Sequence, residues 1–388
     1  MQMPSAYTKG YESARALDPE RARNYVAHTV IGDPEADELL EELAPLGQEE
    51  LGRLIQIGMD GDERALRDAP AVLRAFFESC AAPPDWLDLP GHMPGIRMYH
   101  RNSRLVLGAM VAGTLVEGFA TNIAKSFFIT GKVRDQGIRR LKQNNRHMVE
   151  IFLPGGLERD GDGWKLSVRI RLVHAMVRRL LDGSEDWDQE AWGTPVSAAH
   201  TGFAITAFSA RSLKHLKSLG AQFTDEERAS FMQVWRYSGH LMGIPETILF
   251  RDESDALETF KIGLACEPEA GLESVSLANA LVNSSPLIAG VTDPAARRKL
   301  AHYVYRVSRA LIGPQIADQL MFPHYPTSGV LWWFRMQNRY DNCMNRLFKS
   351  RARKNNKLSA MLDVAMVDEA GINYRLPDHV YAEESSRW

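Results

Sequence analysis

The apolar residues of this chain recur with the period of an α-helix, and the clearest case runs from Trp164 to Leu181. A stripe with a period near 3.6 residues predicts an amphipathic helix; here it consists of Leu166, Ile170, Val173, Val177, Leu180 and Leu181. His174 lies inside this stripe, so we expect it to point inward. Convincing period-two strands flanked by hairpin turns are hard to find elsewhere. The sequence therefore predicts an all-α protein.

Capping residues mark the starts of three further helices, at Asp33-Pro34, at Thr224 with Glu227, and at Asp293-Pro294. The second pair has the spacing of a capping box, and proline is favoured in the first turn of a helix. We expect these helices to run to Leu43, to Gly243, and to the residue before Gly313.

A proline-rich stretch from Ala81 to Pro94 indicates a connector within the chain. We expect an N-terminal helical cap with this connector over residues 1–94, a core over residues 95–325 and a C-terminal helical extension over residues 326–388. The three parts would form a single large helical domain with peripheral N- and C-terminal helices.

Charge and cysteine usage exclude several classes of protein. A formal net charge of −3 argues against non-specific nucleic-acid binding, and the strong basic cluster from Arg346 to Lys357 is local. Cys80, Cys266 and Cys343 form no CxxC pair, which fits a reducing compartment. The N-terminus lacks a signal-peptide core, and the apolar run from Leu105 to Val116 is too short to span a bilayer. We therefore expect no transmembrane segment and a cytoplasmic location.

Two successive segments between Arg139 and Leu181 carry a lysine and a histidine beside arginines. Arg171 and Arg178 lie three residues before and four after His174, so their guanidinium groups can flank one face of the helix. An imidazole between two such groups suits haem iron with its two propionates. A buried histidine with one hydrogen-bonded nitrogen, beside two solvated arginines, is the simpler alternative.

The earlier segment is strongly polar. Arg139, Arg140 and Lys142 are followed by Gln143, Asn144 and Asn145. Such a run either lines a pocket or forms a solvated basic face, which is the more common outcome.

Other motifs have competing interpretations. We expect His200 and His240 near helix ends and His215, between Lys214 and Lys217, on a solvent-facing surface. HxxxH and HExxH pairs do not occur, which disfavours a non-haem metal site. The aromatic run Trp332-Trp333-Phe334 is expected in the core. Glycines at five-residue steps (Gly108, Gly113 and Gly118) permit close approach either to a flat ring or to another helix.

Several strings together resemble one family, the haem b rubber oxygenases called latex-clearing proteins, with the related mpaB-type oxygenases. The resemblance covers roughly residues 95 to 320. Its strings are Arg139-Arg140-Leu141-Lys142-Gln143, Pro154-Gly155-Gly156-Leu157, Gly161-Asp162-Gly163-Trp164, Val168 to Arg178, and Trp235 to Ile244.

The resemblance implies roles for individual residues. His174 would be the proximal haem ligand, Lys142 a distal ligand of the iron and Arg139 a pocket arginine. This chain has Gln143 where the family typically has threonine. The family's catalytic base is a glutamate upstream of the arginine, and the nearest candidate is Glu117. Arg140 joins Arg171 and Arg178 as a candidate cofactor contact.

The resemblance also implies a globin-like haem-binding core and a haem b-dependent oxygenase. Such an enzyme would use O2 to oxygenate or cleave an unsaturated apolar molecule, which for a cytoplasmic protein would be small and diffusible. A non-catalytic haem protein that binds a gas or haem is the alternative. A helical regulator without a cofactor is a third interpretation. The substrate and the oligomeric state do not follow from the sequence.

Overall fold

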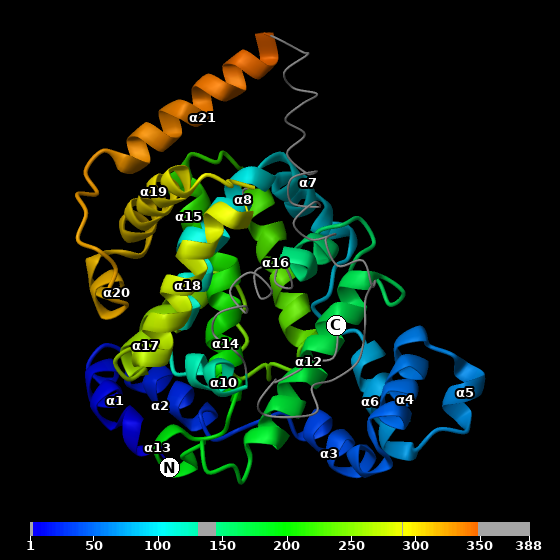
Figure 1. Ribbon diagram of the computed structural model, residues 1–388. Coiled ribbons are helices and arrows are strands. Elements are labelled where there is room, and N and C mark those ends of the chain that lie inside the picture. Colours follow the sequence, from blue (N-terminus) through cyan, green and yellow to red (C-terminus); the bar gives the residue numbers. More distant parts are fainter. Residues whose placement is uncertain (1–2, 131–144, 289, 348–388) are drawn as a thin grey trace.

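The computed structural model describes residues 3–130, 145–288 and 290–347. Every regular element in these ranges is a helix, as predicted (Figure 1). The first six α-helices are α1 (Thr8–Arg15), α2 (Pro19–His28), α3 (Pro34–Leu43), α4 (Gln48–Asp60), α5 (Glu63–Arg67) and α6 (Ala71–Ala81).

The middle of the chain forms the centre of the bundle. Its elements are α7 (Met93–Arg101), α8 (Ser103–Ala109), η4 (Met110–Thr114), α9 (Leu115–Phe119), α10 (Ile123–Ile129), α12 (Asp162–Leu181), α13 (Gln189–Trp192), α14 (Ala198–Thr206), η5 (Ala207–Arg211), α15 (Ser212–Leu219) and α16 (Asp225–Leu241). The remaining helices are α17 (Glu253–Cys266), α18 (Leu272–Ile288), α19 (Pro294–Ile312), α20 (Pro314–Gln319) and α21 (Val330–Leu347). Short 3₁₀ turns cover Ser5–Tyr7, Ala44–Leu46 and Pro90–His92.

The predicted helix starts are confirmed by their hydrogen bonds. The Asp33 carboxylate accepts the Ala36 N–H, and the Asp293 carboxylate accepts the Ala296 N–H. Thr224 and Glu227 make both bonds of a capping box. The helix that they open ends at Leu241, two residues before the expected Gly243.

One apolar core extends through most of the described chain, from Tyr7 to Val330. Helix α16 packs along α7 and α12, and α17 packs along α1, α2, α14 and η5. Tyr7 from the first 3₁₀ turn and Tyr25 from α2 are both buried in this core. Residues 1–94 therefore contribute to the core as well as covering it, while a domain boundary at residue 94 stays a prediction.

Two segments inside otherwise α-helical stretches have π geometry, η4 before α9 and η5 before α15. A π turn is rare and contains more residues per turn than an α-helix, and such turns are frequent at functional sites. Because η4 and η5 contact each other, the two irregular turns meet in the interior.

No described helix by itself is long and apolar enough to cross a membrane. The stretch Ser103–Phe119 and the helix Ile123–Ile129, which meet at 94°, satisfy length and composition criteria only when taken together. Most of their side chains are buried within the protein.

Helix α21 follows α20 and lies at the outside of the bundle, beside α19 and α15 (Figure 1). Phe334 packs on the core, but Trp332 and Trp333 are 56% and 54% exposed. The expectation of core packing was therefore wrong for the two tryptophans, because the inner face of this helix is formed by their neighbours.

Candidate functional site

His174 lies in the middle of α12 and is half-buried. Val177 and Leu181 follow it by three and seven residues, so all three share one side of the helix. Val177 and Leu181 belong to a small apolar cluster with Ile123, Trp187 and Val196, which Phe127 and Ile129 adjoin. The imidazole is therefore next to an apolar region between α12 and α10.

The two arginines that flank His174 bind carboxylates of α3. The Arg171 Nε lies 2.6 Å from Asp33 Oδ2, and its Nη2 lies 2.7 Å from Glu35 Oε2. The Arg178 Nε lies 2.8 Å from Asp37 Oδ1, and its Nη1 donates to the Val196 carbonyl. These contacts differ from the expected pairing with propionates, because the acidic first turn of α3 packs directly against α12. A cofactor-binding role for the pair stays a prediction.

A polar contact joins α12 to α16. Ser167 Oγ lies 3.0 Å from Ser238 Oγ and 2.9 Å from His147 Nε2. Burial lowers the pKa of His147 to about 4, so this imidazole is neutral at pH 7. The contact fixes how α12 rotates against α16, and hence where His174 points.

Glu117, the candidate base, is fully buried on α9 and has two basic partners. Arg211 at the end of η5 forms an ion pair with it, and its Nε donates to Glu117 Oε2 at 3.1 Å. His215 Nε2 lies 3.0 Å from the same oxygen. Burial disfavours the charged carboxylate, but His215 and Arg211 outweigh burial and lower the pKa of Glu117. A carboxylate held in this way is a poor proton acceptor at neutral pH.

The approach of His215 depends on Gly113 in η4. A Cβ atom on Gly113 would lie 2.6 Å from His215 Cδ2, closer than real side chains come. Of the two roles considered for the evenly spaced glycines, close helix packing therefore applies to Gly113.

The solvent-facing position expected for His215 was wrong, since this side chain is only 1% exposed. Lys214 and Lys217 do lie toward solvent, but His215 shares the inner side of α15 with Leu216 and Leu219, as helical spacing dictates.

A second buried polar network surrounds Glu267, which follows directly after α17. Tyr25 Oη donates to Glu267 Oε1 at 2.6 Å, and the Asn122 backbone N–H donates to Oε2 at 2.6 Å. Tyr7 Oη also bonds to Glu267 and lies 2.8 Å from His200 Nε2. Burial raises the pKa of Glu267 to about 7. Because these residues come from five separate segments, nothing in the sequence associates them.

The remaining predicted site residues, Arg139, Arg140 and Lys142, lie outside the described residues, as does Gln143. Of those described, His174, Arg171 and Arg178 share α12, whereas Glu117 belongs to the separate cluster with Arg211 and His215. Across residues 3–130, 145–288 and 290–347, no group of three or more His, Cys, Asp or Glu side chains is arranged to hold a metal ion.

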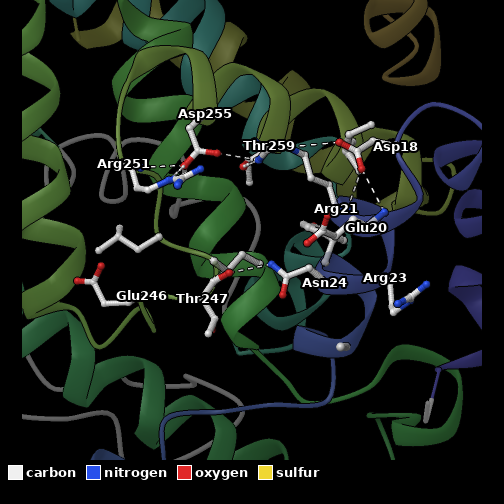
Figure 2. Close-up of a pocket in the computed structure, with 15 residues that line it drawn as sticks. Asp18, Glu20, Arg21, Arg23, Asn24, Glu246, Thr247, Arg251, Asp255 and Thr259 are labelled. Carbon is white, nitrogen blue, oxygen red and sulfur yellow. Dashed lines mark hydrogen bonds and ion pairs between the residues drawn. The ribbon is translucent and has the colours of Figure 1, made fainter.

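A surface hollow of about 820 Å³ lies between α2, α17 and the loop after α16 (Figure 2). Its walls are charged: Arg21 pairs with Asp255 at 2.8 Å, and Asn24 donates to the Thr247 carbonyl at 2.8 Å. Its lining includes none of the predicted site residues. Because the walls are charged and mutually paired, the hollow is poorly suited to an apolar molecule.

Comparison with known proteins identifies the class. Residues 97–339 match the family described as ER-bound oxygenase mpaB/B'/rubber oxygenase, catalytic domain. This match covers more than half of the sequence, so the chain belongs to that family of oxygenases.

Two individual relatives agree with this assignment. The rubber oxygenase of Streptomyces sp. (strain K30) is 23% identical over 299 residues, which are 69% of each chain. A solved structure of latex clearing protein LCP in the closed state superposes with a TM-score of 0.68 at 18% identity, covering 87% of this chain and 91% of that one. The second comparison establishes a shared fold.

Proposed function

We propose that this protein is a haem b-dependent oxygenase that uses O2 to oxygenate or cleave an unsaturated apolar small molecule. The observation that carries the proposal is the position of His174: half-buried on α12, beside an apolar cluster, within the region that matches an oxygenase family.

The described residues fit such a cofactor. Haem is a flat and largely apolar ring whose iron accepts a neutral imidazole, and His174 has Val177 and Leu181 on its side of the helix. When bound, haem b would supply the chemistry of oxygen activation. The protein's own contribution would be to hold the His174 imidazole in place and to keep water away.

Other residues support or complete this arrangement. Arg171 fixes α12 through its bonds to Asp33 and Glu35, so it acts here as a positioning residue. Under this proposal Arg140 would contact the propionates, and Arg139 and Lys142 would contribute the polar groups near the iron. A lysine can ligate iron only as the neutral amine, and adjacent arginines favour that form by like-charge repulsion. For Glu117 we propose a supporting role, because its low pKa opposes service as a base.

Haem binding is tested by absorption spectroscopy of the purified or reconstituted protein. His174→Ala should lose the Soret band or release haem readily, while far-UV circular dichroism stays that of an α-helical protein. His302→Ala is the matched control, because His302 is exposed on α19. Full haem occupancy with an unchanged spectrum in His174→Ala would exclude this ligand. Lys142→Ala should change the ferric spectrum if Lys142 binds iron.

Oxygenase activity is tested separately, by O2 uptake and ¹⁸O incorporation into a set of apolar alkenes. The holoprotein should consume O2 and label the product, and His174→Ala should not. Stoichiometric haem without turnover of any alkene would favour the alternative of a gas- or haem-binding protein.

A further inference from the structure

The outer face of α21 carries exposed aromatic residues that the oxygenase proposal does not use. Trp332, Trp333 and Tyr340 are 56%, 54% and 63% exposed. Few other large apolar side chains in the described ranges are as exposed, and exposed apolar surface that gathers in one place marks an interaction site.

These side chains share one side of the helix. With 3.6 residues per turn, Trp332, Trp333 and Tyr340 fall within about 100° of the circumference, and half-buried Met336 lies between them. The opposite side is attached to the protein, since Leu331 and Phe334 pack on the core and Arg335 donates to the Ser218 carbonyl at 3.1 Å. Helix α21 therefore has two apolar faces. One packs on the core of the protein, and the other faces solvent.

Positive charge is concentrated in the same part of the chain. Residues 330–357 contain eight Lys and Arg but a single acidic residue, Asp341, a formal charge of +7. Because the whole chain has a charge of −3, the rest carries −10. The basic cluster from Arg346 to Lys357 thus begins within the last turns of the aromatic helix and continues beyond the described residues.

We propose that α21 docks this protein onto the surface of an anionic phospholipid bilayer. Tryptophan and tyrosine prefer the headgroup level of a membrane, where the ring is apolar and its polar tip remains wet. An adjacent run of Lys and Arg is attracted by anionic headgroups. Aromatic anchoring and basic charge together are the two signals that give stable peripheral binding.

A second copy of this chain fits the same face less well. The central parts of protein–protein interfaces are depleted of lysine, whereas the exposed aromatics here are followed by a dense basic run. Two such helices would also repel each other through their equal charge. The position of α21 at the edge of the bundle (Figure 1) leaves its aromatic face accessible to a flat surface.

The full chain should be tested by co-sedimentation with vesicles, which requires no enzymatic activity. Vesicles of phosphatidylcholine with about 30% phosphatidylserine should bind the protein at low ionic strength, and pure phosphatidylcholine vesicles should bind it much less. Raising the salt to about 0.5 M should weaken binding. Absence of sedimentation with the anionic vesicles would overturn the proposal.

Variants separate the two signals. Trp332→Ser with Trp333→Ser should weaken vesicle binding about tenfold or more and abolish tryptophan quenching by brominated lipid, since it removes the apolar anchor. Leu272→Ser is the matched control, because Leu272 is 74% exposed on α18. Replacing Arg351, Arg353 and Lys354 by serine should remove the preference for phosphatidylserine. The same charge loss at Lys9, Arg15 and Lys261, exposed on α1 and α17, should not.

Two results would contradict membrane docking. Equal vesicle binding by the wild type and the double tryptophan variant would show that α21 is not the anchor. A concentration-dependent dimer in light scattering that the same variant converts to a monomer would assign the face to a second copy of this chain.

Discussion

Arg171 and Asp33 form a buried ion pair with two parallel hydrogen bonds, Nε to Oδ2 at 2.6 Å and Nη2 to Oδ1 at 2.8 Å. Both side chains are 8% exposed. Because Asp33 is also the N-cap of α3, this pair joins the start of α3 to the helix that carries His174. Its strength therefore determines how firmly that histidine is held.

Arg171→Met should destabilise the haem-free protein by about 3–5 kcal/mol, because it leaves a buried carboxylate without its partner. Urea unfolding followed by circular dichroism measures the loss. Arg228→Met is the control: its more exposed pair with Glu253 should contribute about 1 kcal/mol or less. Unchanged stability of the haem-free variant combined with faster haem loss would instead assign Arg171 to a propionate.

Glu117→Gln should reduce stability by a similar amount, about 3–5 kcal/mol, since the Arg211 guanidinium would lose its neutralising charge. The pKa of Glu117 is lowered by folding, so its stabilising contribution is present above the unfolded value of 4.5 and is lost as the pH falls below it. Unfolding titrations should show a shallower acid dependence in the variant. Identical acid dependence in both proteins would contradict the paired carboxylate.

Gly113→Ala should be destabilising although alanine is the better helix former. The added Cβ would lie 2.6 Å from the His215 ring, and the ring cannot retreat without breaking its bond to Glu117. We expect a loss of about 1–3 kcal/mol, typical of overpacking. Gly118→Ala is the control, because no described atom lies within 4 Å of its Cβ position. A variant at Gly113 as stable as the wild type would show that η4 can move.

Glu267→Gln should change the pH dependence of stability with the opposite sign to Glu117. The pKa of Glu267 is about 7 in the folded protein against 4.5 when unfolded. Between these values the folded state keeps a proton that the unfolded state releases, so this group makes stability fall as the pH rises, by at most about 3 kcal/mol. The neutral glutamine should remove that fall.

The wild type and the Glu267 variant should be compared by thermal unfolding from pH 4.5 to pH 7.5. Burial lowers the pKa of His200 to about 4, which makes stability rise with pH in part of this range. Because both proteins contain His200, their difference isolates Glu267. A constant difference at all pH values would show that Glu267 is already ionised at the acid end.

Helix positions followed from local sequence signals. The stripe around His174 predicted a helix from Trp164 to Leu181, and α12 begins two residues earlier. The cap at Asp293 and the stop at Gly313 bounded α19 correctly. Such signals act within one or two turns, so they do not depend on the rest of the chain.

The contacts between helices were largely invisible in the sequence. Nothing near Arg171 indicates that its partners are Asp33 and Glu35, more than 130 residues away. The predicted solvent exposure of His215 was wrong because it followed from the flanking lysines and ignored the helical spacing between His215 and Leu219. The predicted burial of Trp332 and Trp333 was wrong for a different reason. The apolar character of a residue does not show which face of its helix packs on the core.

The paired π turns also make chain length a constraint on the interior. Each π turn contains residues beyond the requirement of an α-helix. Deleting one residue from η4 would let the helix close regularly, whereas inserting one residue into the regular turns of α8 would rotate everything after it by about 100°. Glu117 would then swing away from Arg211 and His215 without any change in its own identity. In the segments around η4 and η5, the number of residues therefore determines the buried contacts as much as the identity of each residue does.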